Sequence, residues 1–212
     1  MLNTAIDLMQ RGETPSVSEA AEAAGVSRAT AYRYFPSQTA LVQSVVDEAL
    51  GPILNWSSDS EDAEERVDDL LRSSSDRIVE FESTFKAALK LSLEQWAQDR
   101  AGTLGAEPAF KRGHRVELLQ KAIQPLRKRL GAAQFSRLAK ALSLTYGLEV
   151  LIVLKDLWGL DSKEMQRVAR WAARSLVQAA LLEADALKAN GRAVATPGSR
   201  RRNVATASLA GS

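Results

Sequence analysis

The stretch of sequence that decides the fold is SVSEAAEAAGVSRATAYRYFPSQTAL, residues 16–41. Ser16 stands three residues before Glu19, which predicts a capping box at the start of a helix. Gly25 supplies a left-handed turn residue that ends this helix. Ser27 then caps a second helix, expected over 28–35. Two short helices joined by a tight turn are therefore predicted.

Small side chains in the first of these helices allow a close crossing. Ala20, Ala21 and Ala24 let the second helix approach the first, which is the geometry of a helix-turn-helix unit. In such a unit the N-terminal residues of the second helix face base edges in the major groove of DNA. Arg28 offers two hydrogen bonds to guanine, and Thr30 offers a hydroxyl and a methyl group.

The run as a whole resembles the DNA-binding domain of TetR-family transcriptional regulators. The resemblance rests on Ala20-Ala21, Ala24-Gly25-Val26-Ser27, Thr30, Tyr32-Arg33-Tyr34-Phe35 and the Ser37 to Leu41 helix start. It implies a homodimer that binds a palindromic double-stranded DNA operator as a repressor and is released by a small-molecule effector. By position, it implies DNA contacts from Ser16, Ser27, Arg28, Thr30, Tyr32, Arg33, Tyr34 and Gln38.

Three features depart from the family pattern. Gln38 stands where the family usually has a phosphate-binding Lys, so the donor is kept and the charge is lost. Ala31 stands where Leu is usual. The first helix, expected over residues 3–10, starts almost at Met1, whereas family members commonly carry a basic arm before it. Residues 1–50 hold three basic and six acidic residues, so charge alone does not indicate a nucleic-acid binder.

The rest of the chain predicts an all-α fold with a larger helical domain. No stretch alternates apolar and polar residues as a strand would. Helices are expected near 61–82, with a soft spot at Ser73-Ser74-Ser75, and near 84–99, 109–130, 133–157 and 162–189. The predicted domains are 1–51 for the helix-turn-helix unit, 52–190 for effector binding and dimerisation, and 191–212 as a disordered tail.

Composition removes several classes of function. The chain has no cysteine and one histidine, His114, which excludes thiolate and multi-histidine metal sites. There is no phosphate-binding glycine loop and no nucleophile paired with a base, so we expect no enzyme activity, metal or cofactor. The N-terminus lacks the pattern of a signal peptide, and the most apolar stretch, 142–160, carries three charges. We therefore expect a cytoplasmic protein that does not enter a membrane.

Aromatic and apolar residues of the middle helices are the candidate lining of an effector pocket. They are Phe85, Leu89, Trp96, Phe110, His114, Leu118 and Tyr146. The last two helices are apolar on every side, which indicates burial on more than one face. The candidate dimer interface there is Val150, Val153, Leu154, Val168, Ala172, Ala179 and Leu182; a fully buried core helix is the alternative.

Other interpretations of the chain stay open at this point. Residues 16–41 could be a plain helical hairpin without a ligand. The whole chain could be a helical enzyme with an N-terminal accessory domain. It could also be a ligand-binding or protein-interaction dimer with weakened or lost DNA binding, which Gln38 and the negative first domain favour.

Overall fold

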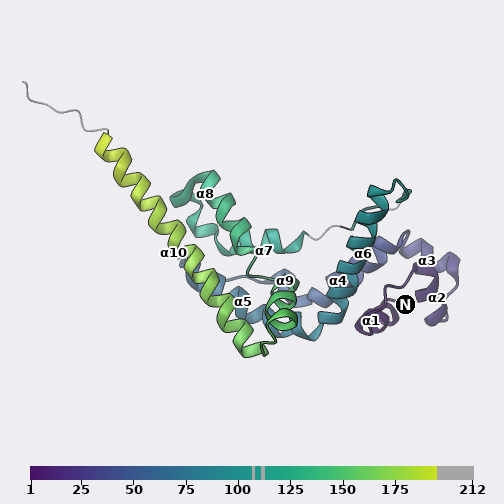
Figure 1. Ribbon diagram of the computed structural model, residues 1–212. Coiled ribbons are helices and arrows are strands. Elements are labelled where there is room, and N and C mark those ends of the chain that lie inside the picture. The colour runs from purple at the N-terminus through teal and green to yellow at the C-terminus, as the bar shows by residue number, and fades with distance from the viewer. Residues whose placement is uncertain (107, 111–112, 195–212) are drawn as a thin grey trace, which may run out of the picture.

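The computed structural model describes residues 1–106, 108–110 and 113–194. These residues contain helices and turns and no strand, which confirms the all-α prediction. The helix-turn-helix unit lies at one end of an elongated molecule, and α8 and α10 lie toward the other end (Figure 1). Within the described part, no helix combines the length and apolarity needed to cross a bilayer.

Four helices form the N-terminal unit: α1 (Leu2–Gln10), α2 (Val17–Ala23), α3 (Arg28–Tyr34) and α4 (Gln38–Leu50). Their starts follow the expected caps. The hydroxyls of Ser16, Ser27 and Ser37 accept hydrogen bonds from backbone N–H groups of the first turns of α2, α3 and α4. Each cap satisfies a donor that the first turn of a helix leaves free.

The remaining elements form the larger part of the molecule. They are η1 (Gly51–Asn55), α5 (Ala63–Glu80), α6 (Glu82–Arg100), α7 (His114–Ala122), η2 (Gln124–Leu126), α8 (Arg127–Leu142), α9 (Leu148–Val150), the π-helical η3 (Leu151–Leu157) and α10 (Ser162–Val194). α10 packs against α5 and α8, and α5 also packs against α7.

Two of the long helices expected from the sequence are broken. The expected helix 109–130 begins only at His114 and breaks where Pro125 enters η2, because proline cannot donate a helical hydrogen bond. The expected helix 133–157 is interrupted over residues 143–147, between α8 and α9, and the interruption ends at Gly147, whose φ of +99° lies in the left-handed region. The expected end of a helix at Gly131 is present as a kink within α8, with φ of +72°.

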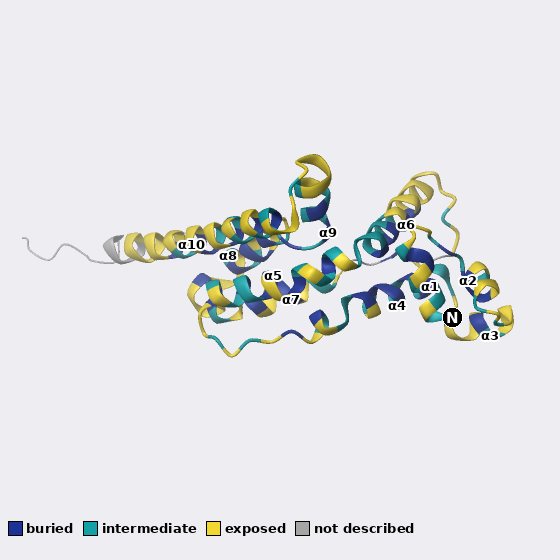
Figure 2. Ribbon diagram, turned by 90° about the horizontal axis from the view of Figure 1, so that it is seen from below, coloured by how far each residue is buried: buried dark blue, intermediate teal, exposed yellow. Residues whose placement is uncertain are grey.

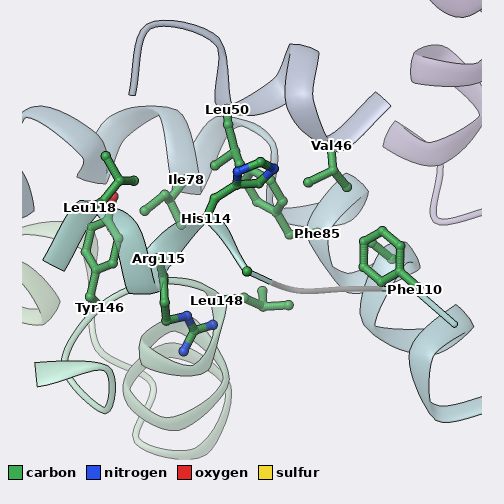
Figure 3. Close-up of a pocket in the computed structure, with 13 residues that line it drawn as sticks. Val46, Leu50, Ile78, Phe85, Phe110, His114, Arg115, Leu118, Tyr146 and Leu148 are labelled. Carbon is green, nitrogen blue, oxygen red and sulfur yellow. The ribbon is translucent and has the colours of Figure 1, made fainter. Parts of the chain in front are cut away.

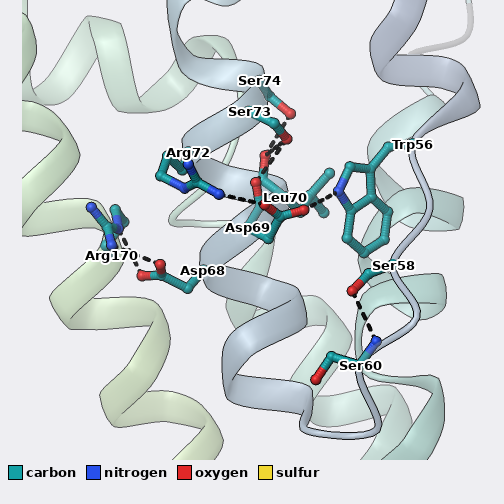
Figure 4. Close-up of polar contacts among 10 residues, drawn as sticks. All are labelled: Trp56, Ser58, Ser60, Asp68, Asp69, Leu70, Arg72, Ser73, Ser74 and Arg170. Carbon is teal, nitrogen blue, oxygen red and sulfur yellow. Dashed lines mark hydrogen bonds and ion pairs between the residues drawn. The ribbon is translucent and has the colours of Figure 1, made fainter.

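The serine run in α5 does not interrupt that helix. Ser73 Oγ donates to the carbonyl of Asp69 at 2.7 Å, and Ser74 Oγ donates to the carbonyl of Leu70 at 2.6 Å (Figure 4). A serine hydroxyl that bonds back one turn is satisfied inside a helix. The soft spot is therefore continuous helix.

The buried apolar residues form two cores. One core lies among α5, α7, α8 and α10. The other contains residues of α1 to α4 together with Ala87, Ala88 and Leu91 of α6, and Phe110. α6 thus belongs by packing to the N-terminal unit as well, although it follows residue 51 in sequence. The predicted domain boundary at residue 51 stays a prediction.

α10 runs beyond the end expected for it. The helix extends to Val194, whereas the sequence placed its end near residue 189. The predicted disorder of 195–212 falls outside the described residues. One face of α10 is buried against α5 and α8, and much of the opposite face is exposed (Figure 2).

Candidate nucleic-acid interface

The α2–α3 unit is closed by local hydrogen bonds. Ser16 N donates to Glu19 Oε2 at 2.7 Å, and Glu19 N donates to Ser16 Oγ at 3.2 Å, which completes the predicted capping box. The hydrogen bond from the Ser16 backbone holds the pKa of Glu19 below its usual range. At the next cap, Thr30 N donates to Ser27 Oγ at 3.2 Å. Both helix starts are thus built from neighbours in sequence.

The turn between the two helices depends on a glycine and on small buried residues. Gly25 has a φ of +66°, as the turn requires. Val26 N donates to the carbonyl of Ala21 at 2.9 Å and closes the end of α2. Ala20, Ala21 and Ala31 are fully buried, because α2 and α3 cross closely at these positions.

The outer face of α3 carries large exposed polar side chains. Arg28 and Arg33 are exposed, and the exposed fractions of Tyr32 and Tyr34 are 46% and 66%. Tyr32 Oη lies 3.4 Å from Ser18 Oγ on α2. The Arg33 guanidinium lies over the Tyr34 ring, 5.1 Å from its centre. Such a face offers hydrogen-bond donors and flat rings to a ligand.

The four other predicted contact residues, Ser16, Ser27, Thr30 and Gln38, are already engaged within the chain. Ser16 forms the capping box, and Thr30 Oγ1 accepts from Ser27 Oγ at 3.0 Å. Gln38 Nε2 donates to the carbonyl of Thr14 at 3.0 Å and is partly buried. The Gln38 amide therefore ties the start of α4 to the loop before α2.

A cavity of about 100 Å³ lies between α4 of the N-terminal unit and the larger part of the molecule (Figure 3). Five of the residues predicted for a pocket line it: Phe85, Phe110, His114, Leu118 and Tyr146. Two others, Leu89 and Trp96, do not line this cavity, and their role in effector binding stays a prediction. Trp96 is 64% exposed on the outside of α6, and Leu89 packs half-buried against the larger core. Both lie on the same side of α6 as the cavity-lining Phe85 but further along the helix, Leu89 by about 6 Å and Trp96 by about 16 Å.

The cavity wall is mostly apolar, with three polar side chains. His114 Nε2 lies 2.7 Å from Asp47 Oδ1 of α4. Arg115 Nη1 donates to the carbonyl of Ser143 at 3.1 Å, and its Nη2 is paired with Glu149. Tyr146 Oη donates to Ser74 Oγ at 3.0 Å, and burial raises the pKa of this phenol.

The sequence interpretation missed the contribution of α4 to this cavity. Val46 and Leu50 line it, together with Ile78 of α5 and Leu148 of α9. In the sequence, the apolar pattern around these residues indicates only ordinary core positions. Only the packing of α4 against α6 brings them to the cavity wall.

The candidate dimer residues divide by exposure. Val153, Val168, Ala179 and Leu182 are exposed, whereas Val150, Leu154 and Ala172 are half-buried. Leu182 is 72% exposed, and so is Trp171 of the same helix at 71%. The helices that carry these residues are therefore not fully buried core helices.

Comparisons with known proteins agree with this geometry. Residues 2–45 match the family model described as bacterial regulatory proteins, tetR family. The solved structure of a TetR transcriptional regulator from Rhodococcus sp. RHA1 is similar, with a TM-score of 0.54 and 21% identity. The similarity covers 83% of this chain and 92% of that one. No curated protein matches the chain. Residues 2–45 thus resemble the N-terminal domain of the tetR family of bacterial regulatory proteins, and the overall fold is similar to that of a TetR transcriptional regulator.

Proposed function

We propose that the protein is a homodimeric transcriptional repressor that binds a palindromic operator in double-stranded DNA and leaves it when a small molecule binds. The observation that carries DNA binding is the exposed face of α3. Arg28, Tyr32, Arg33 and Tyr34 all stand free of the core on a capped recognition helix. Arginine beside hydroxyl-bearing residues suits both base edges and phosphates.

The exposed face of α10 supports the homodimer. Val168, Trp171, Ala179 and Leu182 follow one another at the spacing of a single helix face and are exposed in the monomer. Trp171 and Leu182 lie on this face, and the exposed fraction of each side chain is above 70%. Large apolar side chains exposed together are typical of a surface that binds a partner. A second copy meeting this face would form a two-fold interface, which matches a palindromic site.

The position of the cavity supports release by a small molecule. Val46 and Leu50 of α4 form part of its wall, so a bound molecule would touch the N-terminal unit directly. At about 100 Å³ the cavity is smaller than the roughly 300 Å³ of the smallest usual ligand sites. An effector of usual size would therefore need to push the wall outward, and α4 is part of that wall.

A second function is a ligand-binding dimer with weakened DNA binding. The specific observation in its favour is the hydrogen bond from Gln38 to the Thr14 carbonyl, which engages the side chain at the phosphate-binding position. Residues 1–50 hold more acidic than basic residues, which also favours weakened DNA binding. The same experiment separates the two functions.

The test is a selection of genomic DNA fragments from the source organism on the purified full chain. Binding of the recovered fragment is titrated at several salt concentrations. The expected result is one palindromic site, bound more weakly as salt rises. Arg28→Ala should lower the affinity by about 5- to 150-fold, the range for a lost bidentate base contact of roughly 1–3 kcal/mol.

A matched variant controls for the loss of charge. Arg129→Ala removes an exposed arginine from α8, at the opposite end of the molecule from α3 (Figure 1). It should leave operator binding unchanged. Equal binding by the Arg28 and Arg129 variants would refute base recognition by α3. Recovery of no specific fragment would favour the second function.

A further inference from the structure

A buried amide on α6 joins the first turn of α4 to the segment that carries Pro108 and Phe110. Gln95 lies on α6 and is 5% exposed. Its Nε2 donates to Thr39 Oγ1 at 2.8 Å and to the carbonyl of Pro108 at 3.2 Å. Its Oε1 accepts from the backbone N–H of Phe110 at 2.7 Å. Because that N–H is only a donor, it fixes which side of the amide is oxygen.

The partner on α4 lies close to the recognition helix. Thr39 is the second residue of α4, is 8% exposed, and donates its own hydroxyl to the Pro108 carbonyl at 2.7 Å. Only the three residues 35–37 separate α3 from α4. A displacement of the first turn of α4 therefore displaces the recognition helix with it.

The other partner lies at the cavity. Phe110 lines the cavity wall, and its backbone N–H is held by Gln95. A second lining residue, His114, is bonded to Asp47 further along α4. Thr39 and Asp47 are eight residues apart, about 12 Å along a helix. The wall of the cavity is thus bonded to α4 at both places, once through Gln95 and once directly.

Because these groups are buried, separating Phe110 or Thr39 from Gln95 costs free energy. An unpaired polar group inside a protein costs more free energy than a single exposed hydrogen bond is worth. Both hydrogens and the oxygen of the Gln95 amide are used. Movement of Phe110 away from Gln95 would leave a buried acceptor unpaired. Movement of Gln95 and Thr39 with Phe110 avoids that cost.

We propose that Gln95 is a positioning residue for the recognition helix, coupling the cavity wall at Phe110 to the first turn of α4. The proposal rests on the proposed DNA-binding function, because it assigns to that function a residue outside the helix-turn-helix unit. It concerns the orientation of α3 and not a contact with DNA.

The test compares Gln95→Leu and Thr39→Val with Gln98→Leu. The last variant makes the same substitution at an exposed position of the same helix. Two readouts are used on the full chain: affinity for the selected operator, and amide hydrogen exchange at Ala40 and Leu41 in the first turn of α4. The Gln95 and Thr39 variants should bind the operator at least about fivefold more weakly, the lower end of usual coupling between sites.

The two amides should also exchange faster in both variants. The double variant should bind the operator no more weakly than either single variant, because all three lose the same connection. The Gln98 variant should match the unchanged protein. Helix content and melting temperature show that each variant is folded. If Gln95→Leu does not fold, Thr39→Val, which keeps the shape of its side chain, decides.

The proposal would be overturned if the Gln95 and Thr39 variants had the same operator affinity and the same exchange rates in α4 as the Gln98 variant. Failure of the proposed function is recognised separately. In that case the unchanged protein selects no DNA, and the exchange measurement alone decides whether Gln95 holds the start of α4.

Discussion

Replacement of Asp68 by Asn should weaken the packing of α5 against α10. The Asp68 carboxylate accepts two hydrogen bonds from Arg170, from Nε at 2.7 Å and from Nη2 at 2.6 Å (Figure 4). Fully exposed pairs contribute about 0.2–1 kcal/mol, whereas hydrogen bonds to charged groups contribute about 1.5–3 kcal/mol. The side chains of Asp68 and Arg170 are 24% and 34% exposed, so an intermediate value of about 1–2 kcal/mol applies.

The assay for this loss is thermal unfolding followed by circular dichroism. For a chain of this length, 1 kcal/mol corresponds to about 2–4 °C, so a loss of about 1–2 kcal/mol should lower the melting temperature by about 2–8 °C at pH 7. Asp76→Asn is the control, because it removes the same charge from α5 at a residue with only a 3.4 Å contact to Gln166. An equal melting temperature for both variants would refute the reasoning.

The same pair predicts a dependence on pH. The hydrogen bonds from Arg170 hold the pKa of Asp68 below its usual value. A carboxyl group whose pKa is lower in the folded state stabilises that state above the unfolded pKa of about 3.9 and loses this contribution as pH falls through the folded value. The difference in melting temperature between the unchanged protein and Asp68→Asn should therefore shrink below about pH 4. A difference that is constant from pH 7 to pH 3 would contradict the ion pair.

Three further predictions concern the recognition helix, the phosphate position and the dimer. Ser27→Ala removes the cap of α3 and should cost about 1 kcal/mol of stability, measured by denaturant unfolding. Gln38→Lys should make the slope of log affinity against log salt steeper by about one unit, measured on the selected operator; an unchanged slope would show that this position does not meet phosphate. Trp171→Glu should convert the proposed dimer to a monomer in sedimentation, whereas Trp96→Glu, at the exposed tryptophan of α6, should not.

The helix-turn-helix unit was predicted from the sequence in considerable detail. The caps at Ser16, Ser27 and Ser37 and the turn at Gly25 all stand where the sequence places them. Each of these signals is local, because a capping hydroxyl bonds an amide two or three residues away and a glycine acts on its own backbone. Such features do not depend on how the rest of the chain packs.

The longer helices were predicted less well, and for a related reason. Apolar residues run through 142–160 without a period that separates one helix from the next, so the break at Gly147 does not stand out among the twelve glycines of the chain. Serines in sequence suggest a weak point, yet those in α5 are satisfied by carbonyls of the preceding turn. Helix interruptions depend on whether the surrounding packing satisfies the backbone.

The cavity and its connection to α4 were decided only by the tertiary structure. Gln95 bonds Thr39 across 56 residues of sequence, and His114 bonds Asp47 across 67. Nothing in the pattern around either residue specifies such a partner, because a contact of this range exists only when α4, α6 and α7 are packed together. Local signals therefore specify the surface that we propose to face DNA, whereas the connection between that surface and the cavity arises from packing alone.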